Sequence, residues 1–224
     1  MISMTPRKDI SLQRTLVTPV LSIMVTLCVG ATIFALLGYD PLASLYQFFI
    51  VPLSRPDQVA DVFVKACPLI ITATGLVFCY RANVWNIGAE GQIVMGAVCA
   101  GGVALFAPGL PDILLMPAMV LAAMVGGMAW ALIPGILKVR FNTNEILVSL
   151  MLTYVAILLL SVMVHGPLRD PTGFNFPESR LFHDAATLPK LFSAGRGHLG
   201  FVFALIFAVL GTWLVKRWHL GFEM

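Results

Sequence analysis

Six long apolar runs dominate this sequence and leave little choice of fold. The first extends from Leu16 to Leu37, and as a helix it would be about 33 Å long, enough to cross the hydrocarbon core of a bilayer. Only 11% of the residues are charged, whereas a soluble domain carries roughly 25%. A surface this apolar suits lipid as its solvent. The sequence therefore predicts an all-α membrane protein, a polytopic bundle of about six transmembrane helices.

The domain organisation follows from the positions of these runs. A signal peptide has an apolar region of roughly 7–15 residues, so the longer first run is expected to remain as a span. We predict a cytoplasmic tail over residues 1–15 and a transmembrane domain over 16–224, with a polar periplasmic loop at about 166–198. A short amphipathic segment, 41–53, is expected to lie in the membrane interface. The spans are predicted at 16–37, 59–80, 92–107, 113–137, 144–165 and 199–215.

The basic residues predict the orientation of the chain. With the amino terminus inside and the spans alternating, eight of the 14 Lys and Arg residues face the cytoplasm. Four of the six on the other side fall in the loop 166–198, so the remaining connections favour an internal amino terminus by eight to two. The eight internal residues are Arg7, Lys8, Arg14, Arg81, Lys138, Arg140, Lys216 and Arg217.

A Gly-rich polar stretch separates the second and third spans. Residues 81–92 lie between two uncharged runs of only about 15 residues, a pattern typical of discontinuous helices that expose backbone groups to a transport path. Glycines in this stretch permit a left-handed backbone or close approach of another chain segment. An ordinary turn, with Glu90 stabilising a helix start, is the alternative. The candidate translocation-path residues are Asn86, Gly88, Glu90, Gly91 and Gln92.

Two further patterns predict helix geometry. Asn142 is expected to cap the fifth span, with Glu145 reaching back to its backbone N–H and Asn144 between them. The fourth span carries small residues at every fourth position, which would allow another helix to approach closely. The small residues form two series, Ala123, Gly127, Ala131 and Gly135, and Ala118, Ala122 and Gly126.

Several kinds of chemistry have no sequence support. The phosphate-binding pattern G-x-x-x-x-G-K-[ST] is absent, so ATP hydrolysis by this chain is not expected. The four cysteines lie in apolar runs without a C-x-x-C pair and are interpreted as small apolar residues. A net charge of +3 is too small and scattered for nucleic-acid binding. We therefore predict no catalytic residue, no metal site and no cofactor.

Three motifs, in order, resemble those of a known family. The stretch Asn86-Ile-Gly-Ala-Glu-Gly-Gln92 resembles the N-I-G-x-E-G-Q signature of ABC permeases for simple sugars and nucleosides, relatives of the ribose and branched-chain amino acid permeases. Thr143-Asn-Glu-Ile146 and Met151-Leu-Thr-Tyr154 resemble the T-N-E-[VI] run and the M-L-N-Y segment that follows it, with Thr153 where Asn is usual. The resemblance extends from about Asp57 to Met224.

This resemblance implies a permease subunit of an ABC importer in the bacterial inner membrane. Its implied partners are membrane lipid, a cytoplasmic ATPase subunit, a second permease subunit and a periplasmic or lipoprotein solute-binding protein. The final motif resembles the start of the segment that docks on the ATPase, and its candidate coupling residues are Leu220, Gly221, Phe222 and Glu223. Family members continue beyond this segment, so a partial permease is expected.

An ion-coupled secondary transporter is the alternative function. It would need carboxylates at membrane depth, and the acidic residues here fall at span edges or in loops. An intramembrane enzyme would need a catalytic pair at that depth, and the sequence offers none. The motifs leave open which sugar or nucleoside is carried, and whether the second permease is identical.

Overall fold

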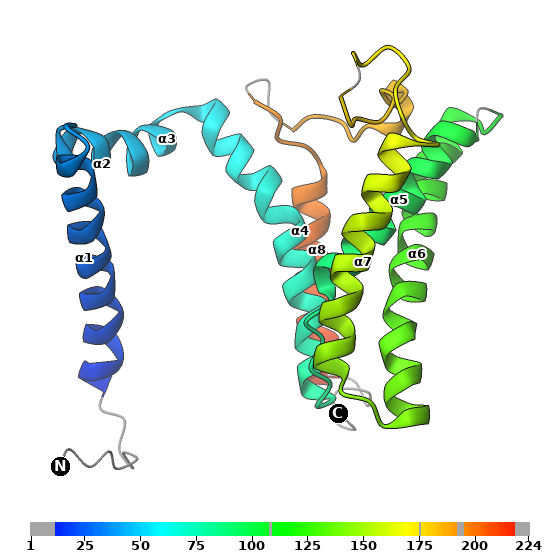
Figure 1. The fold of residues 1–224 in the computed structure, drawn as a ribbon, viewed down its shortest axis with the longest axis horizontal. Helices are drawn as coiled ribbons and strands as arrows, with labels where there is room; N and C mark the ends of the chain where they lie inside the picture. The colour runs from blue at the N-terminus through cyan, green and yellow to red at the C-terminus, as the bar shows by residue number, and fades with distance from the viewer. Residues whose placement is uncertain (1–11, 108, 175, 192–194, 218–224) are drawn as a thin grey trace. The chain divides into compact units, whose positions relative to one another are not determined.

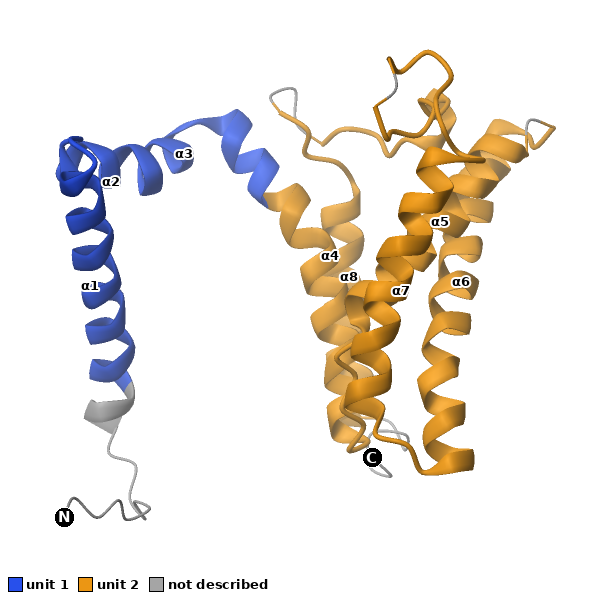
Figure 2. Ribbon diagram, in the orientation of Figure 1, with its two compact units in different colours: residues 1–62 blue, residues 63–224 orange. Residues whose placement is uncertain are grey.

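The computed structural model describes residues 12–107, 109–174, 176–191 and 195–217. Across these ranges six helices are long and apolar enough to cross a membrane, which confirms the predicted fold class and span count. The chain divides into two compact units, residues 1–62 and residues 63–224, coloured separately in Figure 2.

The first unit contains α1 (Leu12–Leu36), α2 (Pro41–Phe49), α3 (Val51–Ser54) and the beginning of α4 (Pro56–Arg81). Helix α1 ends in a Schellman motif: Gly38 has φ +82°, and the Tyr39 N–H donates to the Phe34 carbonyl at 3.0 Å. Asp40 then caps α2, its carboxylate accepting from Leu42 N–H at 2.9 Å. The predicted amphipathic segment is thus two short helices.

The second unit is the helical bundle. It contains most of α4, then α5 (Ala89–Phe106), α6 (Asp112–Phe141), α7 (Glu145–His165) and α8 (Gly200–Arg217). Helix α5 packs against both α6 and α7 (Figure 1). The connection between α4 and α5, the turn between α6 and α7 and the end of α8 all lie at one end of this unit.

The polar loop lies at the opposite end of the second unit (Figure 1). Two isolated antiparallel bridges shape it, Arg169 with Ser179 and Lys190 with His198. The short 3-10 helix η1 (Asp184–Ala186) packs against α6. A Cβ placed on Gly101 of α5 would lie 3.5 Å from the ring of Phe182. The loop therefore folds onto the ends of α5 and α6.

Close packing of α6 through its small residues is confirmed on one side of the helix. A Cβ on Gly126 would lie 3.0 Å from the Met95 carbonyl, and one on Gly127 would lie 3.3 Å from the Gln92 carbonyl. The contact is reciprocal, because a Cβ on Gly96 of α5 would lie 3.0 Å from the Ala123 carbonyl. Gly135 differs, because no atom lies within 4 Å of the Cβ position there.

Candidate functional site

The predicted interruption near residues 81–92 is a non-helical connection between two complete helices. Helix α4 runs unbroken to Arg81 and α5 begins at Ala89. Asn83 adopts a left-handed backbone with φ 55°, and the Val84 N–H donates to the Cys79 carbonyl at 2.9 Å. This hydrogen-bond pattern ends α4 as a Schellman motif, in which asparagine takes the place more often held by glycine.

Asn86 and Gln92 form a reciprocal pair of side-chain amides across this connection. The Asn86 Nδ2 donates to Gln92 Oε1 at 3.2 Å, and the Gln92 Nε2 donates to Asn86 Oδ1 at 3.2 Å. Asn86 Oδ1 also accepts from the Gly88 N–H at 3.0 Å, which fixes the Asn86 side chain against its own backbone. Both side chains are half-buried. Two of the five predicted residues are therefore in direct contact.

Gly88 and Gly91 bring this segment onto α7. A Cβ on Gly88 would lie 2.8 Å from the Ser149 carbonyl oxygen, and one on Gly91 would lie 2.9 Å from Thr153 Cα. The Gly88 φ is −86°, and Gly91 lies within α5. Close approach, and not a left-handed backbone, is therefore what these two glycines allow.

Glu90 does not join the amide pair. Its side chain is exposed and lies in the first turn of α5. A carboxylate there interacts favourably with the positive end of the helix dipole. This placement matches the structural role considered for Glu90 in the sequence.

The capping prediction for the T-N-E run was wrong by two residues. Asn144, not Asn142, caps α7, and its Oδ1 accepts from the Ile146 N–H at 3.0 Å. Asn142 ends α6 instead, in a left-handed conformation with φ 51°. Glu145 does not reach back to the Asn142 backbone: its Oε2 lies 2.8 Å from Lys138 Nζ. The motif therefore closes a tight turn between α6 and α7 with an ion pair.

Exchanging the charges at this turn tests the ion pair. We expect Lys138→Glu to lower the thermal stability of the purified protein, because Glu145 would then face a second carboxylate. The double variant Lys138→Glu with Glu145→Lys should recover most of the loss. The Lys138 side chain is 44% exposed, so the loss should shrink at high ionic strength.

Arg140→Glu, an exposed position on the same helix, supplies the matched control. If it lowered thermal stability as much as Lys138→Glu, net charge and not the ion pair would be responsible.

Sequence reasoning missed Ser149. Its side chain is 2% exposed, and its hydroxyl oxygen accepts from the Ile87 N–H at 3.3 Å. Thr153 was noted only as a departure from the family pattern. Its side chain is also buried, and its hydroxyl donates a hydrogen bond to the Ser149 carbonyl at 3.2 Å. Small residues at 149, 153 and 156 share one face of α7, a spacing that could have marked this face as a close contact.

Two hollows adjoin the amide pair. The larger, about 650 Å³, lies between α4, α5 and α6, with Phe207 of α8 also on its wall. The smaller, about 230 Å³, is lined by the connection between α4 and α5 and by the facing parts of α6 and α7. Asn86 and Gln92 line both. The larger volume is in the range that small-molecule sites occupy.

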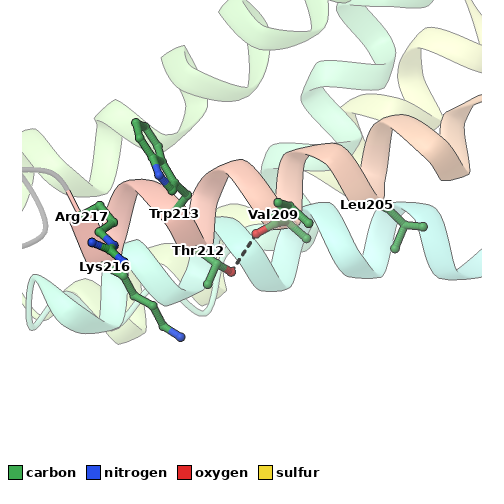
Figure 3. Close-up of a pocket in the computed structure, with 7 residues that line it drawn as sticks. Leu205, Val209, Thr212, Trp213, Lys216 and Arg217 are labelled. Atoms are coloured by element: carbon green, nitrogen blue, oxygen red, sulfur yellow. Dashed lines mark hydrogen bonds between the residues drawn. The ribbon is translucent and has the colours of Figure 1, made fainter.

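The end of α8 directly precedes the predicted coupling residues. Leu220, Gly221, Phe222 and Glu223 lie outside the described residues. Figure 3 shows the preceding turns, where Lys216 and Trp213 project to different sides of α8 beside a groove of about 450 Å³. The Thr212 hydroxyl donates to the Ala208 carbonyl of its own helix at 2.8 Å. Lys216, Arg217 and Trp213 are residue types favoured where a span meets lipid headgroups.

Comparison with known proteins identifies the family of this chain. The family described as branched-chain amino acid transport system, permease component, matches residues 58–224. The chain is 37% identical to a glucose ABC transporter permease protein of Haloferax volcanii, over 100% of this chain and 61% of the relative. It is 29% identical to a guanosine ABC transporter permease protein of Bacillus subtilis, over 93% of this chain and 60% of the relative.

A third relative, a nucleoside ABC transporter permease protein of Lactococcus lactis, is 26% identical over 94% of this chain and 60% of its own length. No solved structure matches the chain significantly. The chain spans about three-fifths of the length of these relatives. It is a multi-pass membrane protein, and it belongs to the family of branched-chain amino acid transport system permease components.

Proposed function

We propose that this chain is a transmembrane permease subunit of an ABC importer and forms part of the pathway for a small polar solute, a sugar or a nucleoside. This proposal is based on the family match over residues 58–224, together with relatives named as glucose, guanosine and nucleoside permeases. ATP is hydrolysed by a separate subunit, and no bond in the solute changes in this chain.

The proposed pathway residues are the Asn86–Gln92 amide pair and two glycines, Gly88 and Gly91, which allow this segment to pack closely against α7. Glu90 serves this segment by stabilising the start of α5. The support is geometric, because the amide pair borders both hollows.

The proposed partners are a cytoplasmic ATPase subunit, a second permease subunit and a periplasmic or lipoprotein solute-binding protein that delivers the solute. Contact with the ATPase is assigned to the segment after α8, residues 220–223. Three helices that reach this end of the bundle, α4, α6 and α8, each carry basic residues in their last turn. Basic residues favour the cytoplasmic side, where an ATPase would dock.

The same bias supports a cytoplasmic amino terminus in the inner membrane, and fusion reporters test it. Reporters joined after Arg14 and after Arg217 should read cytoplasmic, and one inserted at Thr187 in the polar loop should read external. The expectation follows from the basic helix ends and the even span count. An external reading at one terminal fusion alone would contradict the six-span topology, and external readings at both would reverse the assigned orientation.

An ion-coupled transporter is the competing function, and the described spans argue against it. Their carboxylates all lie within the first two turns of a helix, at Asp57, Asp61, Glu90, Asp112 and Glu145. Proton or sodium coupling within the membrane would need a carboxylate deeper in a span.

Uptake measurements distinguish the two functions. Cells that lack the gene should lose uptake of labelled glucose or guanosine, and reintroducing the gene should restore it. Arsenate, which depletes ATP, should stop the uptake, whereas a protonophore should leave it running while ATP is maintained. Uptake that follows the ion gradient and ignores ATP would establish the secondary transporter. Uptake of both solutes that does not change on gene loss would refute the proposed solute class.

A further inference from the structure

The larger hollow is apolar and uncharged along its length. Its described lining residues include none with a charged side chain; the polar side chains there are Thr72 and the two amides of Asn86 and Gln92, with the thiol of Cys79 beside them. Phe207 adds an aromatic ring, and Met124 and Met128 add flexible apolar surface. A charged solute in such a space would lose its hydration without a compensating partner.

The smaller hollow has a different character. It is lined by Trp85 and by both members of the Lys138–Glu145 ion pair, whose charges neutralise each other at 2.8 Å. Asn86 and Gln92 belong to both linings, as do Cys79 and Ala131. The paired amides therefore lie between an uncharged apolar hollow and a smaller hollow that also holds charged side chains, at the end of the bundle where α6 meets α7.

We propose that the Asn86–Gln92 pair is the solute-recognising constriction between the two hollows, and that its ligand is an uncharged polyhydroxylated molecule. This inference rests on the proposed transport function and narrows it. The family carries the description of branched-chain amino acid transport, yet a zwitterionic amino acid finds no ionic partner among the residues described for the larger hollow.

The chemistry of the pair matches that ligand. Each amide gives one N–H and one C=O to the other, at 3.2 Å in both directions. A vicinal diol offers two hydroxyls, each of which donates and accepts, so it can replace both hydrogen bonds as it enters between the amides. Because one set of neutral hydrogen bonds is exchanged for another, no polar group is left unpaired at the constriction. The apolar walls then meet the C–H faces of a sugar ring, and Phe207 can stack against a ring or base.

The surrounding contacts hold the amides in place for this exchange. The Gly88 N–H anchors Asn86 Oδ1 at 3.0 Å, so that oxygen stays oriented when the partner amide is displaced. Gln92 lies one turn into α5, directly after Gly91, where α5 touches the backbone of α7. Only the Gln92 side chain needs to change its rotamer to open the pair.

The native cysteines provide a direct test. Cys79 lines both hollows, while Cys28 is exposed on α1 in the other compact unit. In membranes containing the full-length permease, alkylation by N-ethylmaleimide is followed at both thiols by mass spectrometry. Millimolar D-glucose or guanosine should slow alkylation of Cys79 at least about twofold and leave Cys28 unchanged, and L-leucine should slow neither. Equal protection by L-leucine, or no protection by either neutral solute, would overturn the inference.

Substitutions of the amides complete the test. Gln92→Leu should abolish the protection of Cys79 and raise the KM for uptake about tenfold or more, the effect of losing two neutral hydrogen bonds. Gln47→Leu, the same change on exposed α2, should do neither. The exchange Asn86→Gln with Gln92→Asn keeps two facing amides and should restore protection at least partly. Retained protection in Gln92→Leu would exclude the amide role. The uptake measurement on cells that lack the gene tests the proposed function separately.

Discussion

Replacing Gly91 by valine is expected to abolish uptake while the protein still inserts into the membrane. The Cβ alone would lie 2.9 Å from Thr153 Cα and 3.3 Å from the Thr153 backbone nitrogen. Both atoms belong to the backbone of α7 and cannot turn aside as a side chain could. Helices α5 and α7 must therefore separate, and the segment that holds the amide pair next to Gly91 loses its contact with α7. Insertion survives because the apolar spans are unchanged.

Gly102→Val is the matched control for this prediction. Gly102 lies on the same helix, but no atom lies within 4 Å of its Cβ position. Uptake of labelled solute and the amount of protein in the membrane fraction should be measured for both variants. Normal uptake by Gly91→Val would show that α5 and α7 need not touch during transport.

Valine at Gly126 should cause the largest loss of thermal stability on α6. The added Cβ would lie 2.9 Å from Cys99 Cβ and 3.0 Å from the Met95 carbonyl, at the interface between α5 and α6. Overpacking of a close interface typically costs about 1–3 kcal/mol, and contact with a backbone carbonyl places this site at the upper end. Thermal unfolding of the purified protein in detergent measures the effect.

Gly135→Val makes the same change on the same helix at a position with no atom within 4 Å. Its unfolding temperature should stay near that of the wild type. Equal losses at Gly126 and Gly135 would mean that valine disturbs α6 itself and not its contact with α5.

The spans were predictable because the bilayer imposes their length and apolarity on each run separately. The caps were not, for a reason visible in the run Asn142-Thr-Asn144. Either asparagine can cap a helix, and either tolerates a left-handed backbone. Which one does so depends on where α6 ends, and that is set by the turn that brings Lys138 to Glu145.

The candidate site, like the helices, was predictable only in part from the sequence. The Gly-rich stretch and its residues were recognisable from the sequence, and close approach at Gly88 and Gly91 was one of the two uses foreseen for them. The amide pair was not foreseen, because Asn86 lies outside α5 and meets Gln92 only through the turn at Gly88. Ser149 went unnoticed because small-residue spacing was considered only for the fourth span, although Ser149, Thr153 and Ala156 share one face of α7.

Helix α5 meets three different neighbours through three glycines, Gly91 with α7, Gly96 with α6 and Gly101 with the ring of Phe182 in the polar loop. At the first two contacts the nearest atoms of the neighbouring helix are backbone atoms, Thr153 Cα and the Ala123 carbonyl oxygen. Sliding along such a contact requires few rotamer changes, unlike movement between helices joined by interdigitated leucines. Few side chains would therefore have to rearrange for α5 to shift along α6 and α7 at these two contacts.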